Sequence, residues 1–148
     1  MWTTLPPDTI TRLPERMVNG AATPTPDERA AQAAGWKKCI DALLDVRVLE
    51  DDWDGQGAPA PPPEVVDSAI VLAVLLRQRH VAPPNVTVQG VNRDVLFHWQ
   101  WVDGTFFEIE VIEPGLADAY LMPSGGKTQH WQLRACAAEP AVPAGGGS

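Results

Sequence analysis

The stretch that decides the fold is VLFHWQWVDGTFFEIEVI, residues 95–112. Apolar and polar residues alternate on both sides of a central Val-Asp-Gly, which is typical of two antiparallel strands joined by a tight turn. A two-residue Asp-Gly loop would pair Trp99 with Glu108 and leave neither face of the hairpin apolar. A three-residue loop with Gly104 in the left-handed conformation instead pairs Trp99 with Phe107. We therefore predict the three-residue loop.

This register gives the predicted hairpin two different faces. One face is apolar, and we expect helices to cover it: Val95, Phe97, Trp99, Trp101, Phe107, Ile109 and Val111. The other face is mixed, and we expect it to point outward: Leu96, His98, Gln100, Phe106, Glu108, Glu110 and Ile112.

Further alternating segments extend the hairpin into an antiparallel meander. They cover residues 86–91, 118–122 and 128–133, and turn residues separate them. Two helical patterns precede them. One begins with Asp27 as its N-cap and runs to about residue 48, and the other runs from Pro63 to His80, where Pro83 and Pro84 follow. Helices first and strands later predict an α+β fold, with two main helices packed on one face of a four- to five-stranded antiparallel meander.

The ends of the chain look different from its middle. Residues 1–26 are rich in proline and predict an irregular N-terminal arm that docks through Trp2, Leu5 and Met17. Residues 27–134 form the single predicted α+β domain. Residues 135–148 are small, proline-containing and glycine-rich, and we expect a disordered tail.

Charge and composition exclude several classes of protein. The 148 residues carry a net charge of -8, which opposes direct binding to nucleic acid because that function needs a clustered basic face. No stretch reaches the roughly 18 apolar residues of a membrane span, and the chain does not open like a secretory leader, so we expect a cytoplasmic protein. The two cysteines, Cys39 and Cys136, are expected to be reduced.

A second notable stretch is EDDWDGQGA, residues 50–58. A calcium-binding EF-hand starting at Asp52 would need a carboxylate at its twelfth position, where Pro63 stands. We therefore interpret the stretch as a joint between the two helices, with Trp53 as an apolar anchor and Gly55 and Gly57 allowing sharp turns. Its carboxylates, at Glu50, Asp51, Asp52 and Asp54, are predicted to bind a partner.

Other motifs fail on spacing. PSGGKT at 123–128 lacks the first glycine of a phosphate-binding loop, since Leu121 stands there. The three histidines follow no zinc-binding pattern, and no serine or cysteine lies in a catalytic motif. We predict no catalytic residue, no metal and no cofactor.

The best chemical constellation pairs His98 with Glu108, with Glu110 diagonal to them. A carboxylate that orients an imidazole is the arrangement of a general base. An open sheet face supplies neither a nucleophile nor a pocket, so we interpret the pair as polar residues on a solvent-facing surface.

Residues 36–115 also resemble a widespread set of small uncharacterised bacterial proteins. The shared features are a W-D-G-x-G-A-x-P segment, a helix, a strand ending in tryptophan and an L-E-I-E-like strand. Their carriers here are Trp53, Asp54, Gly55, Gly57, Ala58, Pro59, Trp99, Glu108 and Glu110. The resemblance implies the same outline of the fold and no activity. The chain departs from the pattern at Phe97-His98, where the set often has Leu-Glu.

From charge and from missing catalytic motifs we predict a non-enzymatic acidic protein-binding module. Antitoxins, immunity proteins and phage-type inhibitors or accessory subunits that engage a basic partner are of this kind. One alternative is a hydrolase or metal-dependent enzyme using Asp52, Asp54, His98 and Glu108. The other is a nucleic-acid mimic that blocks a DNA-binding site. The predicted binding residues are Glu50, Asp51, Asp52, Asp54, His98, Phe106, Glu108 and Glu110, and the predicted structural residues are Trp53, Gly55, Gly57, Trp99 and Gly104.

Overall fold

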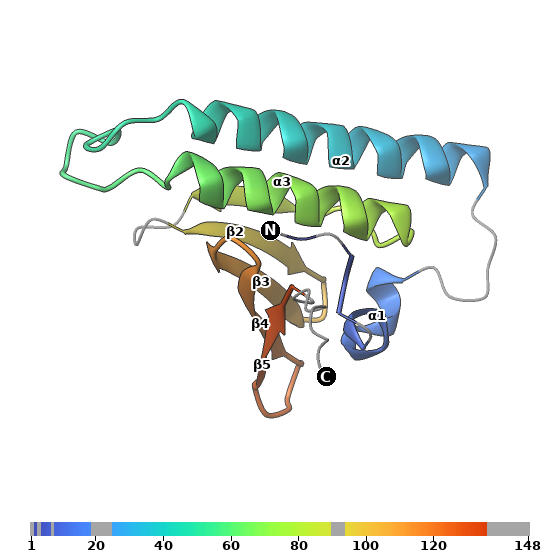
Figure 1. Ribbon diagram of the computed structural model, residues 1–148. Helices are drawn as coiled ribbons and strands as arrows, with labels where there is room; N and C mark the ends of the chain where they lie inside the picture. Colours follow the sequence, from blue (N-terminus) through green and yellow to red (C-terminus); the bar gives the residue numbers. More distant parts are fainter. Residues whose placement is uncertain (1, 3, 7, 19–24, 90–93, 136–148) are drawn as a thin grey trace, which may run out of the picture.

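The computed structural model of the chain has an α+β fold in which helices cover one face of an antiparallel sheet (Figure 1). It describes residues 2, 4–6, 8–18, 25–89 and 94–135. The helices are α1 (Thr9–Arg12), the 3-10 turn η1 (Glu15–Met17), α2 (Pro26–Arg47) and α3 (Pro63–Gln78). The strands are β1 (Val86–Gln89), β2 (Val95–Gln100), β3 (Phe106–Glu113), β4 (Leu116–Met122) and β5 (Gln129–Arg134). They lie in one sheet in the order β1-β2-β3-β4-β5.

The register predicted for the β2–β3 hairpin is confirmed. Trp99 pairs with Phe107, and His98 lies opposite Glu108. Gly104 has a φ of 93°, the left-handed conformation that a three-residue loop requires. The alternation of buried and accessible residues along both strands follows from this register.

The start of α2 differs from the prediction. The N-cap is Thr25 and not Asp27, because the Thr25 hydroxyl accepts a hydrogen bond from the Glu28 amide at 3.1 Å. In return, the Glu28 carboxylate accepts one from the Thr25 amide at 2.8 Å. This reciprocal pair of hydrogen bonds is a capping box. Pro26 suits the first helical position, because a backbone N–H at that position has no acceptor within the helix and proline loses nothing by lacking one. Asp27 lies within the first turn.

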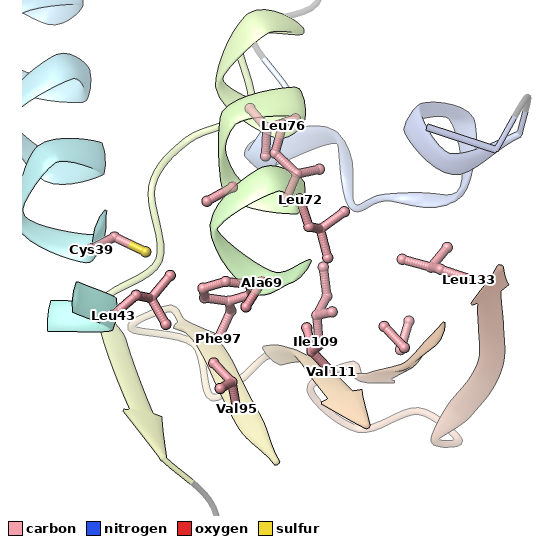
Figure 2. Packing of buried hydrophobic residues seen from close by; sticks show 14 of the residues in the cluster. Cys39, Leu43, Ala69, Leu72, Leu76, Val95, Phe97, Ile109, Val111 and Leu133 are labelled. Atoms are coloured by element: carbon pink, nitrogen blue, oxygen red, sulfur yellow. The ribbon is translucent and has the colours of Figure 1, made fainter. Parts of the chain in front are cut away.

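The hydrophobic core lies between the helices and the inner face of the sheet (Figure 2). α3 packs on β2 and β3, while α2 packs on α3 and on β1. From α3, Ala69, Leu72 and Leu76 point toward the strands. Phe97 and Ile109 meet them from the sheet, and both are fully buried. The apolar stretch of α3 is therefore covered on two sides, by α2 and by the sheet.

The residues that follow α3 are held by two tryptophans. The indole Nε1 of Trp36 in α2 donates to the Val81 carbonyl at 2.8 Å, and that of Trp99 in β2 donates to the Ala82 carbonyl at 2.9 Å. The Ala82 amide donates to the Met17 carbonyl at 2.8 Å. This short segment thus joins α2, the sheet and the N-terminal segment.

The N-terminal segment contains two short helical turns where the sequence predicted an irregular arm. Trp2 and Met17 are buried, and Leu5 packs partly buried on the core. The Arg12 guanidinium lies 4.6 Å from the ring centroid of Trp131 in β5. The Arg16 guanidinium lies 5.2 Å from the ring centroid of Trp101. The predicted tail lies, apart from residue 135, outside the described residues.

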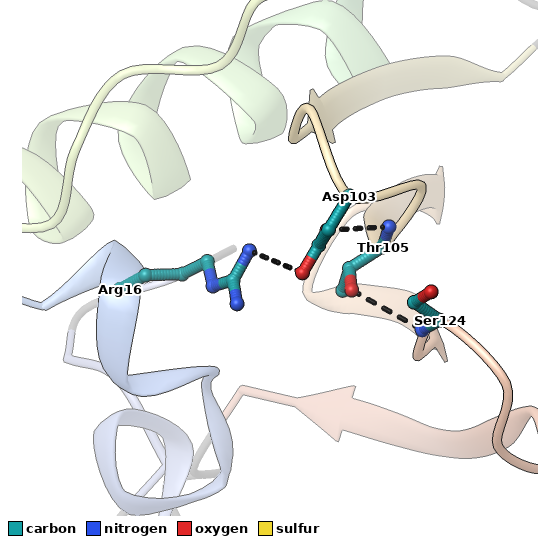
Figure 3. Close-up of polar contacts among 4 residues, drawn as sticks. All are labelled: Arg16, Asp103, Thr105 and Ser124. Atoms are coloured by element: carbon teal, nitrogen blue, oxygen red, sulfur yellow. Dashed lines mark hydrogen bonds and ion pairs between the residues drawn. The ribbon is translucent and has the colours of Figure 1, made fainter.

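An ion pair fixes the N-terminal segment to the β2–β3 hairpin (Figure 3). Arg16 Nη1 lies 3.2 Å from Oδ2 of Asp103, whose Oδ1 accepts a hydrogen bond from the Thr105 amide at 2.9 Å. The Thr105 hydroxyl in turn accepts one from the Ser124 amide. These contacts lower the pKa of Asp103, first through the hydrogen bonds from Thr105 and then through the charge of Arg16. The hairpin turn, the β4–β5 turn and η1 therefore form one polar contact.

Candidate functional site

Two adjacent rows of side chains cross the face of the sheet that the helices leave uncovered, which we call the outer face. The first row runs across β2 to β5 and consists of His98, Glu108, Tyr120 and His130. The second row consists of Leu96, Glu110, Asp118 and Gln132. Every strand pairs with its neighbour in the chain. Alternation along each strand places these side chains on one face, and the register of the strands places them in rows.

Each end of the first row is a histidine close to a carboxylate. His98 Nδ1 lies 3.6 Å from Oε2 of Glu108, and His130 Nε2 lies 3.3 Å from Oδ1 of Asp118. The second contact has the distance of an ion pair without the angles of a hydrogen bond, so this buried oxygen of Asp118 has no hydrogen-bond donor in the described part of the chain. The carboxylates keep capacity to accept further donors.

Aromatic rings stand beside both histidines. His98 stacks on Phe106 with ring centroids 5.3 Å apart, and His130 stacks on Tyr120 at 4.7 Å. Glu108 pairs with His98 on one side and with Tyr120 on the other. The acidic side chains of β3 and β4 therefore lie between two stacked ring pairs.

Glu110 and Asp94 form a pair of acids in contact. Asp94 is 4% exposed, and its Oδ1 has no hydrogen-bond donor among the described residues. The pKa of Glu110 is raised to about 8, first by its hydrogen bond to the Asp94 carboxylate, then by burial, and then by the charges of Asp94, Asp118 and Glu108. Below that pH the Glu110 carboxyl group is protonated and donates a hydrogen bond to Asp94.

The pKa of Tyr120 is also raised, in part by the same acidic residues. Burial raises the pKa of its hydroxyl, and the nearby charges of Asp118, Glu110 and Glu108 raise it further. The charges of Asp118 and Glu108 contribute to both pKa shifts, since a negative field opposes the loss of a proton. A positive charge placed on this part of the outer face would be attracted.

The outer face carries histidine and acidic side chains close together. Within the described residues, no group of three or more histidine, cysteine, aspartate or glutamate side chains is arranged to hold a metal ion. The His98–Glu108 pair has the arrangement of an oriented imidazole, with Phe106 stacked on His98 and Tyr120 opposite Glu108 in the register of the strands.

The predicted carboxylates of the helix joint lie elsewhere, and three of them, Asp51, Asp52 and Asp54, accept hydrogen bonds from the joint's own backbone. Oδ1 of Asp52 accepts from the Gly57 amide at 2.6 Å, and Oδ1 of Asp54 accepts from the amides of Gln56 and Ala58. Oδ1 of Asp51 accepts from the Ala60 amide at 3.0 Å. The hydrogen bonds from Gln56 and Ala58 lower the pKa of Asp54.

The joint is therefore a loop that is held by hydrogen bonds between its own carboxylates and its own backbone amides. Gly55 and Gly57 have φ values of 73° and 85°, so both adopt the left-handed conformation. Trp53 is only partly buried and donates from Nε1 to the Pro59 carbonyl at 3.3 Å. We expected Asp51 and Asp52 to act only toward a partner, and the structure differs, because both hold the loop in its conformation.

Of the predicted site residues, the structure brings together those of the hairpin and keeps the joint apart. His98, Phe106, Glu108 and Glu110 share the outer face. The joint links the ends of α2 and α3 in the helical layer on the other side of the sheet (Figure 1). The enzyme that needed Asp52 and Asp54 beside His98 therefore lacks its constellation.

The predicted binding residues did not include four residues of the outer face, namely Asp94, Asp118, Tyr120 and His130. The alternation in residues 116–122 and 129–134 carried a signal for three of them, because Ala117, Ala119 and Trp131 mark the inward positions. Asp94 looked like a turn residue, and no local pattern distinguishes a buried aspartate beside a strand from an exposed one.

No protein-family model, curated protein or solved structure matches the chain. The resemblance to the W-D-G-x-G-A-x-P proteins therefore stays a prediction. None of the described helices is both long enough and apolar enough to cross a membrane.

Proposed function

We propose that this chain is a non-enzymatic protein-binding module that takes a basic segment of its partner on the outer face of the sheet. The observation that supports the proposal best is the acidic group at the centre of that face. Glu108 and Asp118 lie next to Glu110 on β3 and β4, and an oxygen of Asp118 has no hydrogen-bond donor among the described residues.

The surroundings of this group favour a guanidinium or an ammonium ion as its ligand. A carboxylate accepts charge-assisted hydrogen bonds from arginine or lysine, and the flat rings of Phe106 and Tyr120 offer faces for cation–π contacts. Lysine and arginine are absent from residues 94–126, so a partner's cation has little competition from this segment. The net charge of -8 would also speed the approach of a basic partner.

Antitoxins, immunity proteins and inhibitors or accessory subunits of phage type act through such surfaces. We assign the chain to this broad class on its charge and on the binding character of the outer face. The resemblance to a set of bacterial proteins adds nothing to the mechanism, because it implied only an outline of the fold.

The experiment uses an arginine-rich synthetic peptide and the full chain. Isothermal titration calorimetry would compare the parent with the double variant Glu108→Gln/Asp118→Asn. The matched control is Asp45→Asn/Glu64→Gln, which removes the same charge from exposed positions on the helices. We expect the outer-face variant to weaken binding by tenfold or more, at about 1.4 kcal/mol per factor of ten, and the control to change it little.

Salt concentration supplies a second criterion. Because exposed charges are screened over about 10 Å at 0.1 M salt, binding should weaken as salt rises. Equal losses in the two double variants, or affinity that salt leaves unchanged, would refute binding through the outer face. Where a natural partner binds DNA, competition by duplex DNA would identify the chain as a nucleic-acid mimic.

A further inference from the structure

We infer that a cleft between α2 and α3 is a binding site for a phosphate group. The cleft has a volume of about 180 Å³ and is lined by Arg29, Gln32, Ala33, Trp36, Arg77 and His80. It lies in the helical layer, on the opposite side of the sheet from the outer face, and the inference does not depend on the proposed function.

The first reason is the charge of the lining in a chain that is strongly acidic. The chain has only 11 lysines and arginines against 19 acidic residues, yet two arginines and a histidine meet at this cleft. Among the residues that the structure describes, no acidic side chain is part of the lining. Within the described residues, neither Arg29 nor Arg77 has an acidic side chain within ion-pair distance.

The arginines come from different helices. Arg77 lies in the last turn of α3, where a cation interacts favourably with the carbonyl ends of the helix. That interaction accounts for Arg77 by itself. It does not account for Arg29, which reaches the same cleft from the first half of α2.

His80 occupies a backbone position that normally favours glycine. Its φ is 62°, and the Val81 amide beyond it donates to the Leu76 carbonyl at 3.1 Å, as in a helix ending with a left-handed residue. A glycine there would end α3 without the steric cost of a side chain in the left-handed region. Histidine instead places an imidazole at the cleft.

The remaining lining residues complete a site for a compact anion. Gln32 is half-buried and has an amide group that can donate. Trp36 is 1% exposed and its Nε1 already donates to Val81, so it forms a fixed wall of the cleft. A phosphate group carries more than one negative charge at neutral pH, about 1.5 to 2, so two guanidinium groups match its charge better than they match the single charge of a carboxylate.

The test is a titration of the full chain with inorganic phosphate, followed by NMR at the side chains of Gln32 and His80. Sodium acetate at matched ionic strength serves as the singly charged comparison. We expect saturable shifts with a Kd on the order of 1 mM for phosphate and weaker binding of acetate. The double variant Arg29→Gln/Arg77→Gln should weaken phosphate binding by tenfold or more.

The matched control is Lys38→Gln/Arg79→Gln. It removes the same charge from the same two helical regions, but neither residue lines the cleft. Circular dichroism would establish that both double variants are folded. Binding that the control weakens as much as Arg29→Gln/Arg77→Gln does, or shifts that rise without saturating, would overturn the inference.

Discussion

The indole of Trp36 donates a hydrogen bond to the carbonyl oxygen of Val81 at 2.8 Å, and this contact joins α2 to the segment that follows α3. Both residues are buried. A buried carbonyl that loses its hydrogen-bond donor still carries the full desolvation penalty. Removing the donor therefore costs more stability than the net free energy that the hydrogen bond contributes.

We therefore expect Trp36→Phe to lower the free energy of unfolding by about 1–3 kcal/mol, measured by urea denaturation. The control is Trp53→Phe. The Trp53 indole also donates to a carbonyl, but at 3.3 Å in a partly buried position where water can replace it. Equal losses in the two variants would contradict a special role for the Trp36 contact.

Gly35 in α2 provides a second test of helix packing. An alanine Cβ at this position would lie 2.4 Å from Cγ of Pro83. In an exposed helix the change from glycine to alanine stabilises by about 1 kcal/mol, but overpacking costs about 1–3 kcal/mol. We expect Gly35→Ala to lower the melting temperature. The double variant Gly35→Ala/Pro83→Ala should recover stability relative to Pro83→Ala alone, and failure to recover would show that the clash is not the cause.

Glu110 predicts a specific dependence of stability on pH. Its pKa rises from an ordinary 4.5 to about 8 on folding, so between these values the folded state holds a proton that the unfolded state has lost. The stabilisation from this proton is complete below the unfolded value and disappears as the pH rises through about 8. Glu110→Gln stays neutral and retains a donor toward Asp94.

Urea denaturation across a pH series measures this effect. We expect Glu110→Gln to be more stable than the parent above about pH 8 and to show a smaller decline between the two values. Glu113→Gln, an exposed position on the same strand, should follow the parent. A Glu110→Gln curve parallel to that of the parent would show that Glu110 titrates normally.

Asp52 tests the loop between the helices. It has a φ of 67°, and its carboxylate accepts a hydrogen bond from the Gly57 amide. Asparagine tolerates the left-handed conformation and keeps an acceptor, whereas alanine does neither. We expect Asp52→Ala to speed amide hydrogen exchange in residues 52–58 and Asp52→Asn to leave it nearly unchanged. Glu50→Gln, with no contact of its own to the loop amides described here, should have no effect; faster exchange in that variant would count against the hydrogen-bonding account.

The β2–β3 hairpin was predictable because only one loop length gives an apolar face. Trp99 and Phe107 had to lie on the same side, and that requirement fixed the register, including His98 opposite Glu108. The sequence also contains the capping-box pattern, with Thr25 and Glu28 three residues apart. The prediction of Asp27 as the N-cap was wrong because it rested on the acidic residue alone.

The rest depended on contacts between distant residues. Asp94, the residue before β2, meets Glu110 of the neighbouring strand β3, and it is buried. Arg29 and Arg77 converge because of how α2 lies along α3, which no local pattern specifies. The hydrogen bond from the Ala60 amide to Asp51 could not be predicted, because it depends on the path of the loop between these residues.

The order of the strands also bears on how fast the protein folds. Each strand pairs with its neighbour in the chain, so every hairpin forms by closing a short loop at little entropic cost. The isolated bridge between Val18 and Val81 instead spans most of the helical region. We expect the sheet to form early and the N-terminal segment to dock late, so mutations at this bridge should mainly accelerate unfolding.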